Sequence, residues 1–205
     1  MKQNQIGRSM IEMLGVLAII GVLSVGGIAG YSKAMMKFKI NKTVQQISEI
    51  VANVRTLYAQ QKNYNGLNTG TAVQMGVIPD ELSTGFQFGR ITNVFGGNIR
   101  VESVYNEYEH SYNLFMVGFE GLPEEACISL ATANWGTTDQ SGVKGVLVGW
   151  LSYGGSFAPF RDGCTEGDTE RGYFACSGRL PISPVNAAKA CKEEGDIAGV
   201  FLIFK

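Results

Sequence analysis

Apolar residues dominate the start of the chain and then recur at the spacing of one helix face. Met13–Tyr31 is an uncharged, mostly apolar run of 19 residues, which as a helix is about long enough to cross a bilayer core of roughly 30 Å. Beyond it, apolar residues recur at intervals of three and four, the period of one helix face. The stripe consists of Ile40, Val44, Ile47, Val51, Val54 and Tyr58.

Polar residues fill the positions between the members of the stripe and predict a solvent-facing side. They are Asn41, Lys42, Gln45, Gln46, Glu49, Asn53 and Arg55. No Pro or Gly interrupts the chain from Tyr31 to Lys62. The pattern therefore predicts a single helix of more than about 50 residues that ends near Lys62, with a membrane half and an amphipathic half.

Beyond Lys62 the pattern changes to turn signals and short strands. Alternating or β-branched segments predict strands at Phe86–Phe88, Ile99–Val104, Tyr112–Phe119, Val143–Leu151 and Gly199–Phe204. Helices are predicted at Ala72–Met75, at Pro123–Asn134 and, after Ser183 as N-cap, at Pro184–Glu194. We expect an α+β head whose antiparallel sheet buries one face against the helical stripe.

Length and charge narrow the class of protein. A chain of 205 residues is long enough for one globular domain and an appendage. It carries 17 basic and 18 acidic residues without a dense basic block, which argues against a direct nucleic-acid site. Its 27 glycines and 5 prolines suit turn-rich β structure rather than a Pro-rich linker.

The apolar run permits two other interpretations. A secretory signal peptide has a shorter apolar region and a small-residue cleavage site, which Gly27–Gly30 matches only loosely. A generic membrane anchor joined to an unrelated binding or enzymatic domain would show the same helical periodicity. The residues before the run separate these alternatives.

The chain begins MKQNQIG, then RSMIE, then the apolar run, and this beginning resembles the prepilin leader of the type IV pilin family. The resemblance covers about the first 60 residues. It implies a leader at 1–7 that a prepilin peptidase cuts after Gly7, so that Arg8 becomes a methylated N-terminus. The family usually has Phe, Met or Leu where this chain has Arg8.

The same resemblance implies a role for Glu12, the fifth residue of the cut chain. In such filaments this acid pairs with the N-terminal amine of a neighbouring subunit, here that of Arg8. An ionisable group near the end of a spanning helix costs about 2.5–3.5 kcal/mol at the bilayer centre, so it needs a partner to move inward. The alternative is that Glu12 lies among the lipid headgroups at the membrane edge and has no role in assembly.

Further expectations concern the run itself and the residues just after it. Gly15, Gly21, Gly26, Gly27 and Gly30 would allow close helix packing, and Gly21–Gly30 could also unwind in a filament. Four lysines follow the run, at Lys33, Lys37, Lys39 and Lys42. The positive-inside rule favours the orientation opposite to the one that the leader implies. We expect the orientation that the leader implies, with the start of the chain in the cytoplasm.

The four cysteines lie in the predicted head, at Cys127, Cys164, Cys176 and Cys191. An even number outside the cytoplasm predicts two disulfides, for which three pairings are possible. The resemblance implies Cys127 with Cys191, because related pilins join their two C-terminal helices. The short separation between Cys164 and Cys176 suits the second bond. The segment NVFGGNIRV also resembles a recurring segment of type IVb pilins.

Catalytic, metal and cofactor chemistry finds little support. The lone His110 has no nucleophile motif nearby, and the cysteines lack the short spacings of zinc sites. Tyr153–Ser156 does not follow phosphate-loop spacing. The acids Asp162, Glu166, Asp168 and Glu170 lack EF-hand spacing, and we expect a solvated, charged loop there. The sequence predicts neither an enzyme nor a metal or cofactor site.

The resemblance implies a pilin fold with four parts: a leader at 1–7, a membrane and filament-core half at 8–31, an amphipathic half at 32–62 and a disulfide-bonded head at 63–205. It implies a single-pass inner-membrane protein with a periplasmic head that later joins an extracellular pilus. The implied partners are copies of itself, the prepilin peptidase and the pilus assembly machinery. Adhesion, motility and DNA or protein transport are the implied uses. A minor pilin and a type II secretion pseudopilin share the same N-terminal features.

Overall fold

A computed structural model describes residues 10–61, 63–86, 89–107, 109–136, 142–149, 167–169, 172–176, 180–193 and 198–205. The chain divides into two compact units, Met1–Lys39 and Ile40–Lys205. The leader at 1–7, Arg8 and Cys164 lie outside the described residues, as do Tyr153–Ser156 and the acids Asp162, Glu166 and Glu170.

The long predicted helix is present as α1, Met10–Tyr58, with 49 residues. It ends earlier than the predicted boundary at Lys62. Gln61 N donates to Tyr58 O at 2.8 Å, which turns the chain, and Tyr64 N donates to Tyr112 O at 2.7 Å. The rings of Tyr58 and Tyr64 lie 5.2 Å apart. The helix ends here because the hydrogen bond from Tyr64 to Tyr112 holds the following chain against the sheet.

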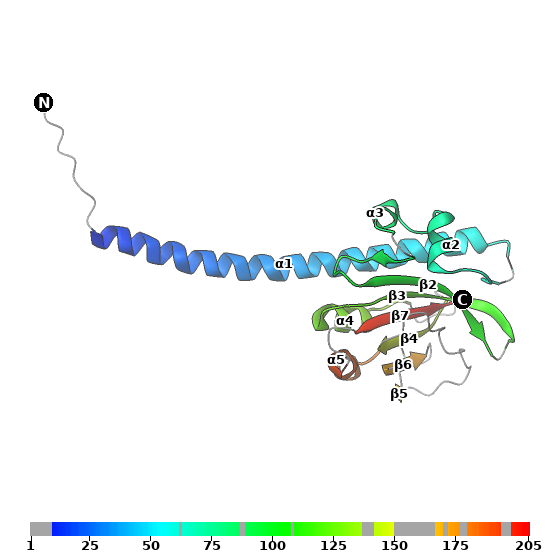
Figure 1. The fold of residues 1–205 in the computed structure, drawn as a ribbon. Helices are drawn as coiled ribbons and strands as arrows, with labels where there is room; N and C mark the ends of the chain where they lie inside the picture. The colour runs from blue at the N-terminus through cyan, green and yellow to red at the C-terminus, as the bar shows by residue number, and fades with distance from the viewer. Residues whose placement is uncertain are drawn as a thin grey trace, which may run out of the picture. The chain divides into compact units, whose positions relative to one another are not determined.

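The head contains a seven-stranded sheet in which every described strand pair is antiparallel, as predicted. The strand order is β1-β2-β3-β7-β4-β6-β5, so β7 lies between β3 and β4 (Figure 1). The strands are β1 Ile91–Thr92, β2 Asn98–Asn106, β3 Ser111–Phe119, β4 Val143–Gly149, β5 Gly167–Thr169, β6 Gly172–Cys176 and β7 Gly199–Phe204.

The strand predictions at Ile99–Val104, Tyr112–Phe119 and Gly199–Phe204 are confirmed by β2, β3 and β7. The strand prediction at Val143–Leu151 is confirmed by β4 up to Gly149. The prediction at Phe86–Phe88 is not confirmed, because Phe86 lies in a loop and the next two residues are outside the described part. The charged loop predicted around Asp168 is wrong at that residue, which lies in β5 and pairs with Tyr173 of β6.

The described part of the head also contains the shorter helices α2 Thr69–Gln74, α3 Asp80–Ser83, α4 Glu124–Ala131 and α5 Pro184–Glu193. The predicted cap of α5 is confirmed, since Ser183 Oγ accepts a hydrogen bond from Asn186 N at 3.3 Å. Helix α4 ends before the predicted Asn134. Helices α4 and α5 pack on each other and contact β4, and the predicted disulfide Cys127–Cys191 joins them with an S–S distance of 2.02 Å.

The buried side of α1 in the head unit is wider than the predicted stripe. Ile47, Val51 and Val54 are buried as expected, and so are Ile50, Thr43 and Gln46. The prediction that Gln46 faces solvent is wrong, because segments after α1 cover that side of the helix. The aromatic residues Phe115 and Phe204 stack at 5.3 Å on paired strands near α1, where Arg55 lies 5.6 Å from the Phe204 ring.

The sheet also carries a second apolar cluster that depends on small residues. It consists of Val104, Leu114, Met116, Leu147, Phe201 and Ile203. Phe201 lies opposite Gly118, where a Cβ atom would come within 2.3 Å of the phenyl ring. Glycine at this strand position therefore makes room for the aromatic ring.

Candidate assembly surface

The first unit presents an apolar surface on all sides of its helix. The large apolar side chains from Met10 to Ile28 are between 53% and 85% exposed. A helix that is apolar all round is stable only inside a membrane or among other apolar helices. Within the described residues, α1 is the only helix long and apolar enough to cross a bilayer.

The glycines of this apolar segment have no packing role against the described residues of the chain. A Cβ atom added at Gly15, Gly21, Gly26, Gly27 or Gly30 would meet nothing within 4 Å. Each Gly nevertheless costs a helix about 1 kcal/mol relative to Ala. Small residues let helices approach each other closely in an apolar medium, so these positions suit contact with helices from other copies.

Glu12 lies in the first turn of α1 and is exposed. A carboxylate at a helix N-terminus also suits the helix dipole. Gly7 and Arg8, the predicted cleavage and N-terminal residues, lie outside the described residues. The pairing of Glu12 with an amine therefore stays a prediction.

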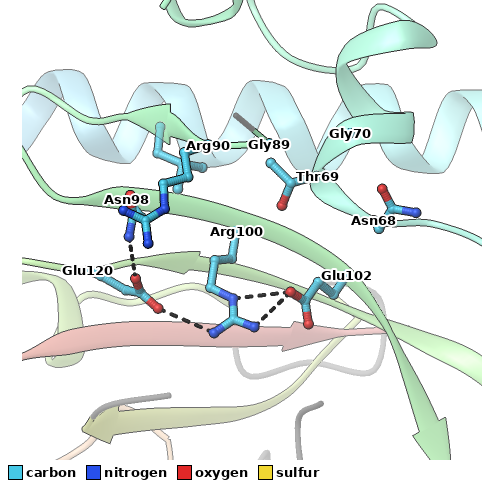
Figure 2. A pocket seen from close by; sticks show the side chains of 10 residues that line it. Asn68, Thr69, Gly70, Gly89, Arg90, Asn98, Arg100, Glu102 and Glu120 are labelled. Atoms are coloured by element: carbon cyan, nitrogen blue, oxygen red, sulfur yellow. Dashed lines mark hydrogen bonds and ion pairs between the residues drawn. The ribbon is translucent and has the colours of Figure 1, made fainter. Parts of the chain in front are cut away.

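The head carries a polar groove of about 460 Å³ between α2 and the outer strands. Figure 2 shows Arg100 on its floor between two acids. The guanidinium lies 2.9 Å from Glu102 Oε1 and 3.5 Å from Glu120 Oε1, and its side chain is only 12% exposed. Asn98 Nδ2 also donates to Glu120 Oε2 at 3.1 Å. These charge-assisted bonds join β2 to Glu120, the residue that follows β3.

The segment NVFGGNIRV forms the turn from β1 to β2, and its buried Asn93 organises that turn. Asn93 Oδ1 accepts hydrogen bonds from Phe95 N and Gly97 N at 2.8 and 3.2 Å. Its Nδ2 donates to Glu120 O at 2.8 Å. Gly97 leaves no room for a side chain, since a Cβ atom would lie 1.8 Å from Glu120 O.

Polar contacts fix the segment after α1 to the helix. Glu81 of α3 accepts a hydrogen bond from Gln46 Nε2 at 2.6 Å and lies 2.8 Å from Lys42 Nζ. Asn53 Nδ2 donates to Val77 O at 2.9 Å. The hydrogen bond from Lys42, followed by that from Gln46, lowers the pKa of Glu81.

The residues considered for chemistry form no reactive group in the described part of the chain. His110 lies in the turn from β2 to β3 with a φ of 47°. No cluster of three His, Cys, Asp or Glu residues that could hold a metal ion occurs among the described residues.

Sequence reasoning missed the groups around Arg100 and Glu81. Arg100 and Glu102 stand two residues apart on one strand, a spacing that places them on the same face and could have indicated their pairing. Glu120 and Glu81 gave no such signal, because their partners are distant in sequence. The sequence also did not indicate the burial of Gln46, because its partner Glu81 is distant in sequence.

Comparisons with known proteins agree with this geometry. The sequence profile of the family described as "PilS N terminal" matches residues 29–152, more than half of the chain. The major structural subunit of bundle-forming pilus of Escherichia coli O127:H6 (strain E2348/69 / EPEC) is 28% identical over 191 residues, 93% of this chain and 90% of that protein. The protein of the same description from Escherichia coli O111:H- gives the same values.

Two solved pilin structures are also similar. The type IVb pilin from Salmonella typhi has a TM-score of 0.44 and 17% identity, covering 76% of this chain and 96% of that one. TcpA, a type IV pilin from Vibrio cholerae El Tor biotype, has a TM-score of 0.44 and 14% identity, with coverages of 81% and 97%. By its match to the family profile over more than half of its length, the chain belongs to the PilS N-terminal family of type IV pilins.

Proposed function

We propose that the chain is the major structural subunit of a type IVb pilus, a filament built from copies of its α1 helix. It waits in the inner membrane as a single-pass protein with a periplasmic head. A prepilin peptidase cuts it after Gly7, and the assembly machinery then adds it to an extracellular filament. Type IV pilins are structural subunits, so the chain carries out no covalent chemistry of its own.

The observation that carries this proposal is the combination of an exposed apolar helix with glycines that no contact among the described residues requires. The apolar side chains of Met10–Ile28 lie on every side of α1. The glycines between them have no neighbour within 4 Å of a would-be Cβ atom. A lipid anchor alone needs the apolar side chains but not the glycines, whereas a bundle of copies uses both.

The proposed role of the major subunit draws on the curated relatives, which are major subunits of bundle-forming pili and are matched over nearly their whole length. In this proposal the head provides a second assembly surface, in addition to α1. Its disulfide and its paired charges around Arg100 hold a fixed surface for contact with neighbouring copies.

The test is electron microscopy of sheared surface material combined with N-terminal mass analysis of the purified filaments. We expect filaments in which this chain is the most abundant protein and begins at Arg8. Assembled material that still begins at Met1 would contradict processing. Filaments in which the chain is a trace component would contradict the major-subunit role and favour a minor pilin.

A further inference from the structure

A pair of lysines lies just beyond the apolar segment of α1. Lys33 and Lys37 are exposed and stand four residues, about one turn, apart, so they share a face of the helix. No acidic residue occurs in the sequence between Glu12 and Glu49. Within the described part of the chain, no acid pairs with either lysine. The two positive charges are therefore not compensated by the described protein.

The length of the apolar segment fixes where these lysines lie in a bilayer. The uncharged run Met13–Tyr31 spans about 28 Å as a helix, close to the roughly 30 Å of hydrocarbon. Lys33 and Lys37 follow about 3 and 9 Å beyond Tyr31. The headgroup layer of one leaflet is roughly 5–8 Å thick, so both ammonium groups reach it, with their flexible side chains taking up the difference.

Two aromatic residues mark the same level. Tyr31 and Phe38 are 67% and 60% exposed and stand seven residues, about two turns, apart on one face. Aromatic side chains, Tyr in particular, gather at the headgroup level of membranes. The aromatic pair and the lysine pair thus occupy one axial stretch of the same helix.

Lys42 provides an internal comparison. It follows Tyr31 by 11 residues, too far along the helix for the headgroup layer, and it pairs with Glu81 at 2.8 Å. Lys42, beyond the headgroup level, is thus paired within the protein, whereas no described acid pairs with Lys33 or Lys37 at that level. The phosphate groups of anionic lipids are the anions available at that depth.

We propose that Lys33 and Lys37 form a binding site for the phosphate groups of anionic phospholipids in the outer leaflet of the inner membrane. The site rests on the proposed membrane-stored state and deepens it by naming a lipid partner. It holds the helix at a defined depth before assembly. It also gives a physical reason why positive charge follows the span, because the lysines there bind lipid phosphate.

The test uses the full chain reconstituted in phosphatidylcholine vesicles with a minor fraction of phosphatidylglycerol. Spin-labelled phosphatidylglycerol and phosphatidylcholine report the relative association of each lipid with the protein. At about fivefold in binding per lysine near an anionic surface, we expect a clear preference for phosphatidylglycerol that falls toward none in the double variant K33Q/K37Q. K33R/K37R should keep the preference, because it keeps the charge.

The matched control is K192Q, which removes an exposed lysine of α5 in the head and should leave the preference unchanged. An unaltered preference in K33Q/K37Q overturns the proposal, and so does its loss on adding millimolar inorganic phosphate, which would indicate a free-phosphate site. If the double variant inserts poorly, the single variants K33Q and K37Q are measured instead. Each should lose part of the preference. Insertion and the N-terminus of assembled filaments are measured separately, so a failure of the pilus proposal is distinguishable from a failure of lipid binding.

Discussion

Gln46 of α1 donates a 2.6 Å hydrogen bond to Glu81 of α3 across 35 residues of sequence. The same carboxylate lies 2.8 Å from Lys42 Nζ. One acid thus connects two successive turns of α1 to the segment that follows the helix. Since Gln46 is buried and polar, its bond to Glu81 satisfies a donor that would otherwise stay unpaired away from water, at a cost of about 1–3 kcal/mol.

The contact of Glu81 should make the head more stable at neutral than at acid pH. Its folded-state pKa is lowered below 4.5 by the Lys42 and Gln46 hydrogen bonds. The stabilisation is therefore present above the unfolded pKa and is lost as the pH falls through the folded pKa. Because the side chain is 48% exposed, we expect only roughly 0.2–1 kcal/mol.

Thermal unfolding of the full chain in detergent at pH 3–7 measures this effect. The wild type should unfold at a higher temperature than E81Q at pH 7, and the difference should shrink below about pH 4.5. E49Q is the control, because Glu49 is on the exposed side of α1. A constant difference between wild type and E81Q across the whole range would show that charge on Glu81 is not the cause.

Replacing Glu12 should impair assembly and spare insertion. E12A removes the carboxylate that we propose to pair with a neighbouring amine, and removing one partner of a desolvated pair costs about 3–5 kcal/mol. We expect filament yield to fall about tenfold or more, with the protein still resistant to carbonate extraction. Normal filaments from E12A would remove Glu12 from this role.

A large side chain at Gly21 should harm the filament and leave the isolated chain intact. G21L fills a position where a Cβ atom meets nothing within 4 Å inside the chain, so the unfolding temperature in detergent should match the wild type. Filament yield should fall, because neighbouring helices would be held apart. V22L, which changes the adjacent position from one large side chain to another, is the control. Equal yields for G21L and V22L would count against glycine-mediated packing.

Gly97 should tolerate no side chain at all. In G97A the Cβ atom would lie 1.8 Å from Glu120 O, so the turn from β1 to β2 must shift and the contacts of Asn93 weaken. We expect a loss of roughly 3 kcal/mol in the free energy of unfolding. G85A is the control, since its Cβ atom would lie 3.6 Å from Leu82 O, an ordinary contact. Denaturant unfolding of both variants measures the difference.

The bond between Cys127 and Cys191 should contribute about 4 kcal/mol by the chain-entropy estimate for a sequence separation of 64. The double variant C127S/C191S should therefore lose stability by about that amount in denaturant unfolding under oxidising conditions. Under reducing conditions the wild type should approach the variant. A wild type that is indifferent to reductant would show that the bond is not stabilising. The predicted pairing of Cys164 with Cys176 lies partly outside the described residues and stays a prediction.

Sequence predicted the parts of the fold that are set by local periodicity. The stripe from Ile47 to Val54 and the cap at Ser183 follow from spacing and residue type within a few positions. The central strand β7 is an unbroken apolar run, GVFLIF, bounded by Gly199. Such signals need no knowledge of the rest of the chain.

What sequence did not predict depends on contacts between distant residues. Gln46 reads as a surface residue until Glu81 is known to lie beside it. Strand β1 has two residues and exists because it pairs with Asn98–Ile99. The paired strands β5 and β6 contain Asp168 and the two glycines Gly167 and Gly172, which single-sequence patterns assign to loops. The leader residues Gly7 and Arg8 were identified by resemblance alone.

The position of β7 between β3 and β4 determines when the sheet of the head can close. Gly199–Phe204 is the last strand in sequence, yet it bridges the two groups of strands that form earlier in synthesis. Before those six residues are in place, β2–β3 and β4–β6 are separate ribbons with open edges. Placement of Gly199–Phe204 is therefore the step that closes the sheet, and a chain without this strand would leave two half-sheets with exposed, aggregation-prone edges.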